Sequence, residues 1–411
     1  MEIIMNKTKE YIYQNWEKCI KENLNDEGTL IGLPYPYTVP AVGHFDEIYY
    51  WDTYFTNLGL DCCDRHIQSK FNTDDMLYLV SKYGYMPNGN RTFYIGRSQP
   101  PFLSEMVKNV YKHYKDEAWL SGAYNTLKKE HAFWMRERIC ETKLNTYGGN
   151  IGKTEDEIKH TASDLETRVG FMPEQNSITE NAKHMIVCCE SGWDCNPRWD
   201  FDGFNYAPVD LNSLMYMFEK NMEFFALELE NNEESGWQKK AEERKELMKK
   251  HMTSKDGFML DYNFKKDKLS HIFSAASFYP MYAKLADDLC AKKTVENLYR
   301  IEGGYGIYCC EKNDAEGTYQ WDYPNGWACL QYIVIKALDN YGYKEDAKRV
   351  AKKYVDLVDD VFEKTGGIWE KYNVKDGNIE VKNEYKMPQM MGWSAGVYMQ
   401  TAKYLETGII D

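Results

Sequence analysis

The chain has 411 residues, of which 43% are hydrophobic and 15% aromatic, so it can bury a large core with aromatic side chains to spare. Its 64 acidic and 50 basic residues give a net charge of −14, which argues against nucleic acid as a partner. No apolar run is long enough to span a bilayer or to serve as a signal peptide. We therefore expect a cytoplasmic protein with no membrane partner, and the sequence leaves its oligomeric state open.

Helical patterning extends along most of the chain, with few runs that alternate like a strand. In the clearest example, Leu211, Leu214, Met215 and Phe218 fall on one helical face. The expected helices, roughly a dozen, span residues 6–24, 52–63, 73–83, 102–115, 117–138, 209–231, 236–251, 274–288, 292–300, 324–339, 343–362 and 392–405. Because no Pro/Ser-rich linker divides the chain, we expect one all-α domain over residues 1–411.

The segments between these helices carry the chemistry. They contain glycines, prolines and clusters of aromatic and acidic residues, and they span 31–51, 84–100, 164–176, 188–208, 301–326 and 365–393. Long irregular loops in a compact domain usually serve function. If the helices pair into a closed ring with these loops at one end, the clusters converge on a single pocket.

The most informative segment runs from Gln320 to Trp327 and reads Gln-Trp-Asp-Tyr-Pro-Asn-Gly-Trp. Polar groups among large rings make a poor core segment, because each needs a partner when buried. Flat rings beside carboxylates and amides suit a sugar, whose C–H faces pack on rings and whose hydroxyls need hydrogen bonds. Similar clusters occur at 49–52, 191–200 and 369–372. The four together indicate a carbohydrate enzyme.

Cysteine and histidine patterns do not indicate a metal or cofactor. The eleven cysteines include no CxxC pair, and the eight histidines include no HExxH. We interpret the cysteines as reduced thiols. Cys195 lies next to Asp194 and could be a nucleophile, but a packing role is favoured because no histidine is nearby in the sequence.

Two segments resemble the signature patterns of the trehalases, glycoside hydrolase family 37. The first runs from Val39 to Phe55 and the second is the segment 320–327. Shorter matches follow in the family's order, at 87–91, 97–101, 191–194, 209–212, 384–385 and 392–393. The resemblance implies an (α/α)6 barrel with long active-site loops at one end. It also implies inverting hydrolysis of an α-glucosidic bond, as in trehalose, by two carboxyl groups about 6.5–9.5 Å apart.

By this resemblance, Asp194 is the general acid and Glu370 the general base. The resemblance and the aromatic–acid clusters together predict these substrate-binding residues: Trp51, Asp52, Asn88, Arg97, Ser98, Gln99, Glu174, Gly192, Trp193, Gln320, Trp321, Asp322, Trp327, Glu384 and Trp393. An indole beside Asp194 would raise its pKa toward that of an acid catalyst. Lys371 either keeps Glu370 ionised or points to solvent. Asp52 and Asp322 are either structural or oriented toward sugar hydroxyls.

The chain departs from the family pattern at two arginine positions, which are His44 and Met172 here. Arginine offers five fixed donors, a neutral histidine one and methionine none. Arg168 or Arg91 could substitute. The substrate is therefore trehalose or another small α-glucoside or disaccharide, such as a glucosylglycerate-like compound. A sugar-binding protein without catalysis is a further alternative, and retention of both candidate carboxylates argues against it.

Overall fold

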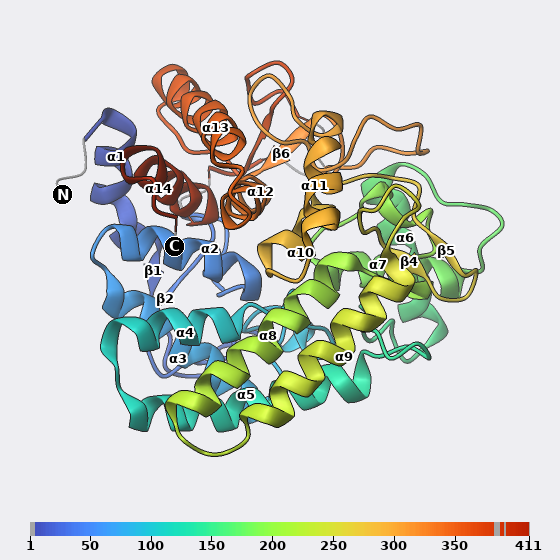
Figure 1. Cartoon of the computed structure of the whole chain (residues 1–411), viewed down its shortest axis with the longest axis horizontal. Helices are drawn as coiled ribbons and strands as arrows, with labels where there is room; N and C mark the ends of the chain where they lie inside the picture. Colours follow the sequence, from blue (N-terminus) through green and yellow to red (C-terminus); the bar gives the residue numbers. More distant parts are fainter. Residues whose placement is uncertain (1–4, 382–386, 390–391, 411) are drawn as a thin grey trace.

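The computed structural model describes residues 5–381, 387–389 and 392–410 (Figure 1). Within these ranges there are fourteen α-helices, and the seven strands have only two or three residues each. The all-α class expected from the sequence is confirmed. None of the helices described is both long enough and apolar enough to cross a membrane.

Six helices pack one against the next in a closed ring, because the last returns to the first. In order they are α2 (Tyr50–Cys62), α4 (Leu103–Tyr114), α8 (Val209–Glu228), α10 (Tyr279–Tyr282), α12 (Ala328–Asn340) and α14 (Gly392–Thr407). Most residues of α2, α8, α12 and α14 are buried on every side. Such helices belong to the inner layer of a larger protein.

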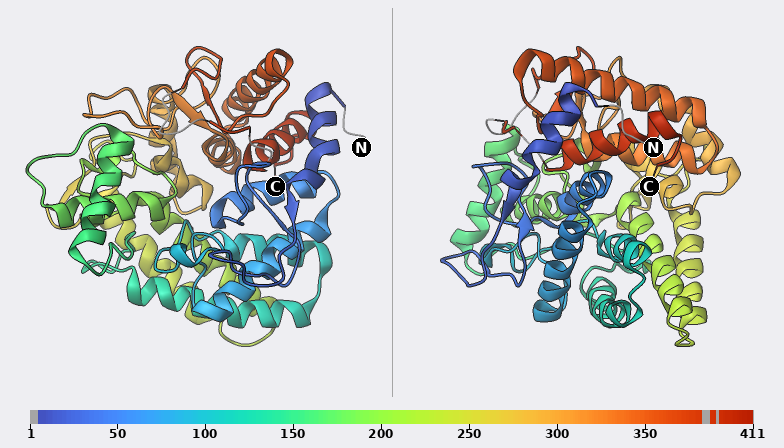
Figure 2. Two further views of the ribbon diagram at one scale, coloured as in Figure 1. Left: turned by 180° about the vertical axis from the view of Figure 1, so that it is seen from behind. Right: turned by 90° about the vertical axis from the view of Figure 1, so that its left-hand side faces the viewer.

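A second layer of helices covers this ring (Figures 1 and 2). It contains α3 (His66–Tyr83), α5 (Glu117–Glu137), α9 (Glu234–Met252) and α13 (Lys344–Thr365). The outer helices are amphipathic. In α13, for example, Val350, Tyr354, Leu357 and Val361 form a buried stripe at helical spacing. This two-layered ring is the (α/α)6 barrel.

The remaining elements lie around the barrel. The helices are α1 (Lys7–Asn15), α6 (Glu155–Val169), α7 (Ile178–Ser191) and α11 (Asp288–Glu296). The strands are β1 (Ile20–Lys21), β2 (Tyr37–Thr38), β3 (Tyr206–Ala207), β4 (Tyr262–Asn263), β5 (Lys268–Leu269), β6 (Asn325–Trp327) and β7 (Lys371–Asn373). They form three small antiparallel sheets, β1–β2, β3–β4–β5 and β6–β7. Helices α6 and α7 pack on each other as a hairpin.

Closure of the ring depends on close packing of α14 against α2. A Cβ atom at Gly396 would lie 2.0 Å from the carbonyl oxygen of Phe55, and one at Gly59 would lie 2.4 Å from the Cα of Gly396. Only glycine permits this approach. The N-terminal α1 joins the same corner, since Asn6 Nδ2 donates to the hydroxyl of Tyr398 at 2.9 Å.

Several predicted helix boundaries are wrong. The expected helix 6–24 ends at Asn15 and continues as a 3₁₀ turn and β1, and 274–288 contains only a 3₁₀ turn and the short α10. Helices α6 and α7 were missed. Both begin with a capping box, from Thr154 to Glu157 and from Ser177 to Glu180, and this signal was available in the sequence.

Candidate active site

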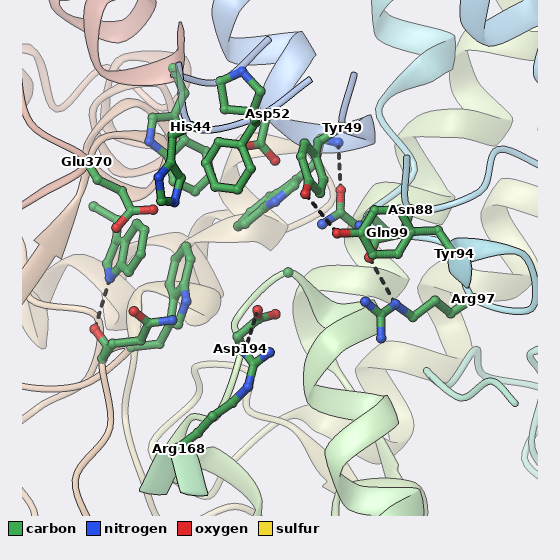
Figure 3. A pocket seen from close by; sticks show the side chains of 18 residues that line it. His44, Tyr49, Asp52, Asn88, Tyr94, Arg97, Gln99, Arg168, Asp194 and Glu370 are labelled. Carbon is green, nitrogen blue, oxygen red and sulfur yellow. Dashed lines mark hydrogen bonds and ion pairs between the residues drawn. The ribbon is translucent and has the colours of Figure 1, made fainter. Parts of the chain in front are cut away.

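A cavity of about 240 Å³ opens where the inner helices α2, α12 and α14 begin (Figure 3). Trp51 and Asp52 are in the first turn of α2, Trp327 precedes α12, and Trp393 is in the first turn of α14. The structure places these predicted residues in the lining: Trp51, Asp52, Asn88, Arg97, Gln99, Gly192, Asp194, Gln320, Trp321, Trp327, Glu370 and Trp393. Loops far apart in the sequence thus converge on one pocket.

Asp194 reaches the cavity because α7 ends at Gly192. This residue has a left-handed φ of +74° and turns the chain sharply after Ser191. A Cβ atom here would lie 2.6 Å from the indole of Trp51. Glycine is therefore required both by the turn and by the close approach of the ring. The turn is held by the hydroxyl of Ser191, which accepts a hydrogen bond from the backbone N–H of Trp193 at 3.1 Å.

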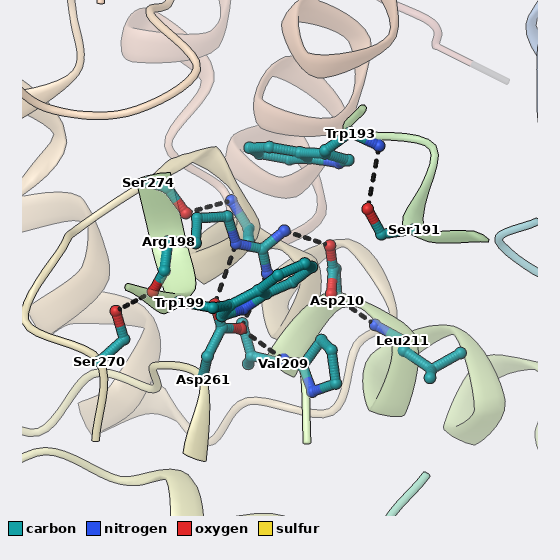
Figure 4. Close-up of polar contacts among 12 residues, drawn as sticks. Ser191, Trp193, Arg198, Trp199, Val209, Asp210, Leu211, Asp261, Ser270 and Ser274 are labelled. Atoms are coloured by element: carbon teal, nitrogen blue, oxygen red, sulfur yellow. Dashed lines mark hydrogen bonds and ion pairs between the residues drawn. The ribbon is translucent and has the colours of Figure 1, made fainter. Parts of the chain in front are cut away.

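Behind this turn lies a buried ionic network centred on Arg198 (Figure 4). Its guanidinium donates to Asp261 at 2.8 and 2.9 Å and to Asp210 at 2.8 Å. It also lies 4.5 Å from the ring centroid of Trp193. Paired in this way, a buried arginine can fix the position of a ring without leaving its own charge uncompensated. The network supports Trp193, the residue directly before Asp194.

The carboxyl of Asp194 faces the cavity beside Arg168 (Figure 3). Arg168 Nη1 lies 3.4 Å from Asp194 Oδ2, and each side chain is 34% exposed. Loss of solvent around the cavity raises the pKa of Asp194 above its ordinary value, and Glu370 raises it further; Arg168 and Arg97 oppose this increase. A raised pKa favours the protonated form that a proton donor needs.

Glu370 enters from a different part of the chain. It directly precedes β7, which pairs with β6 so that Trp327 lies opposite Lys371. The Glu370 carboxylate accepts a hydrogen bond from Lys371 Nζ at 2.8 Å, and both side chains are almost fully buried. Lys371 also donates to Gln320 Oε1 at 3.1 Å and lies 4.6 Å from the ring centroid of Trp327. Of the two orientations considered for Lys371, the structure shows the ion pair.

Indole rings form much of the cavity wall. Trp321 stacks on Trp327 with ring centroids 3.9 Å apart and an interplanar angle of 4°. Trp393 meets the Trp327 ring edge-on at 5.4 Å, and Trp51 lies 5.6 Å from both Trp321 and Trp393. Such a wall offers flat apolar surfaces in fixed orientations.

Hydrogen-bonding groups occupy another part of the lining. Arg97 Nε donates to Asn88 Oδ1 at 2.9 Å, and the guanidinium lies 5.1 Å from the ring centroid of Tyr94. Tyr94 in turn shares a 2.7 Å hydrogen bond with the hydroxyl of Tyr49. The buried Nδ2 of Asn88 and Nε1 of Trp393 have no hydrogen-bond partner among the residues described. Buried donors of this kind normally have one, and both residues line the cavity.

A third carboxyl, Asp52, also lines the cavity. Burial raises its pKa to about 8, opposed by its own backbone N–H and reinforced by the charges of Glu370 and Asp194. At neutral pH this carboxyl is therefore largely protonated and can donate a hydrogen bond. Because the three acids interact, their proton equilibria depend on one another.

Some predicted residues do not line the cavity. Ser98 is buried and donates to the carbonyl of Met86, and Asp322 accepts from Asn313 at 2.8 Å. Trp193 is buried behind the lining, where it stacks on Trp321. Glu174 is exposed in the loop between α6 and α7. Glu384 lies outside the described residues.

The lining also includes residues outside the predicted substrate-binding set: Pro40, His44, Phe45, Tyr49, Tyr94 and Arg168. Four of them belong to the first signature segment, 39–55, which was a usable signal. Of the proposed substitute arginines, Arg168 from the last turn of α6 reaches the cavity. Arg91 instead donates to Glu47 at 3.0 and 3.1 Å. Met172 is partly buried and lies outside the lining.

All eleven cysteines are free thiols. Cys195 is buried and its sulfur contacts that of Met185, which agrees with the packing role favoured from the sequence. Across the described ranges, no three His, Cys, Asp or Glu side chains gather as a possible metal site.

A sequence model of the trehalase family matches residues 3–406. A periplasmic trehalase from Xanthomonas axonopodis pv. citri is 31% identical over 418 residues, covering 95% of this chain and 72% of that protein. One from Pseudomonas aeruginosa is also 31% identical, over 94% of this chain and 74% of that protein.

Solved structures are similar along the same length. The neutral trehalase of Saccharomyces cerevisiae has a TM-score of 0.77 and 28% identity, covering 98% of this chain and 81% of that one. A GH63 mannosylglycerate hydrolase from Thermus thermophilus shares the fold, with a TM-score of 0.66 and 13% identity over 96% of this chain and 99% of that one. This chain belongs to the trehalase family of glycoside hydrolases.

Proposed function

We propose that this protein hydrolyses α,α-trehalose with inversion, using Asp194 as general acid and Glu370 as general base. The observation that carries the proposal is the convergence of these two carboxyl groups, from separate chain segments, on one cavity walled by indoles. The relatives at 31% identity are named trehalases, which supports the choice of substrate.

In the proposed reaction, Glu370 takes a proton from a water molecule as the water oxygen attacks the anomeric carbon. The bond between this carbon and the glycosidic oxygen breaks, and Asp194 gives its proton to the departing oxygen. The raised pKa of Asp194 suits a donor. Lys371 Nζ, 2.8 Å from the Glu370 carboxylate, holds this side chain in position for the role of base.

The lining supplies what a glucose unit needs. Indoles of Trp321 and Trp393 pack against C–H faces, while Arg97 and the Asn88 amide donate to hydroxyls. Asp52, protonated near neutral pH, would donate as well. Arg168 takes the role of the arginine that the family has at the position of Met172, but it approaches from the last turn of α6 rather than from the loop that follows.

One feature of the cavity favours a substrate other than trehalose. A guanidinium that enters from α6, with His44 in place of the other family arginine, changes the donor geometry in part of the pocket. A different small α-glucoside, such as a glucosylglycerate-like compound, is therefore the alternative with the same chemistry.

The test incubates purified protein with trehalose, maltose, sucrose and glucosylglycerate and follows the products by proton NMR. Inverting hydrolysis of trehalose gives equal initial amounts of β- and α-glucose. The attacked glucose is inverted to β, whereas the leaving glucose keeps its anomeric C–O bond and its α configuration. Initial α-glucose alone would refute inversion. If glucose is released faster from another compound, that compound rather than trehalose is the substrate. If a sugar binds but no product forms, the protein is a sugar-binding protein without catalysis.

A further inference from the structure

A second cavity, of about 310 Å³, lies among the inner helices α2, α4, α8, α10 and α12. Trp327, directly before α12, lines the catalytic cavity, whereas Tyr332, Lys336 and Asn340 on α12 line the second one. These residues are 5 to 13 positions further toward the helix C-terminus, or roughly 8–20 Å at 1.5 Å per residue. The two cavities are therefore separate sites within one barrel.

Lysines dominate the lining of this cavity. They are Lys108, Lys112, Lys220, Lys284 and Lys336, and they come from α4, α8, α12 and the turn after α10. Glu105 is the one carboxylate in the lining. In a chain of net charge −14, five ammonium groups around one concavity are a strong local reversal of charge.

Structural roles account for only part of this set. Lys108 binds Glu105 at 3.3 Å and Asn221 at 2.8 Å, Lys220 pairs with Glu223, and Lys336 donates to the carbonyl of Ile410. Lys112 lies in the last turn of α4, where a helix C-terminus favours cations, and its charge also helps to lower the pKa of Glu105. Lys284 is exposed and makes no ion pair with any residue in the described ranges.

The floor of the cavity adds neutral hydrogen-bonding groups. The hydroxyls of Tyr54 and Tyr282 are 2.8 Å apart and nearly buried. Asn109 and Tyr216 extend this polar lining.

The partial negative charge of a helix end amounts to about half an elementary charge and fades within a turn, so the full charges of the lysines outweigh it.

We propose that this cavity binds a phosphorylated small molecule, with the lysine ammonium groups contacting the phosphate oxygens. The cavity is larger than the catalytic one, and hence has room for more than a single inorganic phosphate. Compact ammonium charges suit phosphate groups, and the tyrosine and asparagine side chains suit the polar remainder of the ligand.

The test is isothermal titration of the full chain with inorganic phosphate, pyrophosphate and glucose 6-phosphate at constant ionic strength. We expect pyrophosphate or glucose 6-phosphate to bind more tightly than phosphate. The double variant Lys112→Gln/Lys284→Gln should bind at least about tenfold more weakly, because two charges are removed from the wall. Both side chains are exposed, and neither touches the catalytic cavity, so the variant should keep its fold and its glycosidase activity.

The matched control is Lys129→Gln/Lys255→Gln, which removes the same charge from two exposed positions outside both cavities. It should bind the probes like the parent protein. Three results would overturn the proposal: no binding of either larger probe, equal binding by the Lys112/Lys284 variant, or equal weakening in the control.

Discussion

The two cavities of the barrel differ in chemistry, although the inner helix α2 contributes residues to both. The catalytic cavity, at the helix N-terminal ends, contains three carboxyl groups and a wall of indoles. The second cavity contains five lysines, several tyrosines and no tryptophan. Helix N-termini stabilise negative charge and C-termini positive charge. The helix dipoles therefore favour acids at one end of the barrel and cations at the other. The number of lysines in the second cavity is larger than this effect alone explains.

The sharpest test of the catalytic end is removal of its two acids. Asp194→Asn and Glu370→Gln keep the shape of each side chain but remove the proton donor or acceptor, and each should lower kcat by about 10²–10⁴-fold. Substrate binding, measured by titration calorimetry, should persist. Azide could restore part of the rate in Glu370→Gln by replacing the base.

The control is Asp314→Asn, an exposed acid outside both cavities, which should be as active as the parent protein. Near-normal turnover in either catalytic variant would exclude the assigned role. A loss of binding together with turnover would show that the side chain mainly holds substrate.

The next effect concerns Gly192, which joins α7 to the loop that carries Asp194, the proposed general acid. Gly192→Ala places a methyl group where the Trp51 indole lies, at a backbone conformation that costs other residues about 1–2 kcal/mol. The displaced ring and loop should misplace Asp194, with a decrease in kcat of about 100-fold and a lower Tm. Gly122→Ala is the control, because this helical glycine has nothing within 4 Å of an added Cβ atom. Full activity in Gly192→Ala would disprove the need for glycine.

Arg168 offers a way to test the electrostatics of the catalytic end. Arg168 lowers the pKa of Asp194, so Arg168→Gln should let this pKa increase further. Activity falls as pH rises through the pKa of the general acid. The alkaline limb of the pH–rate profile should therefore move to higher pH, while a shift to lower pH would contradict the assignment. Lys159→Gln, which removes a cation on the exposed part of the same helix, should leave the profile unchanged.

The sequence predicted much of this site because sugar chemistry requires unusual residue combinations. Tryptophans beside acids, such as Trp51-Asp52 and Trp321-Asp322, are recognisable without knowledge of the fold. Within such a motif, however, one residue can line the cavity while its neighbour lies behind the lining and supports it. Trp193 and Asp322 lie behind the cavity beside neighbours that line it, and a sequence does not show which side chain faces which way.

Residues that reach the site from other elements were harder to predict. Arg168 lies at the end of a helix that was itself missed, since only Ala162, Leu165 and Val169 of α6 are buried. Its approach to Asp194 depends on how the α6–α7 hairpin packs. The ring of helices was predictable from periodicity and resemblance, whereas the lysine-lined cavity brings together residues spread over more than 200 positions.

The smallest expected effect belongs to Met172. Arginine at this position would match the family pattern, but Met172 lies outside the cavity lining and Arg168 already brings a guanidinium to Asp194. Met172→Arg should therefore change kcat/KM for trehalose by less than about threefold, since a partly buried residue that contacts no substrate contributes little to the reaction. His44→Arg is the informative comparison, because His44 does line the cavity. A large gain from Met172→Arg would show that this loop rearranges around bound substrate and that Arg168 does not fill the missing role.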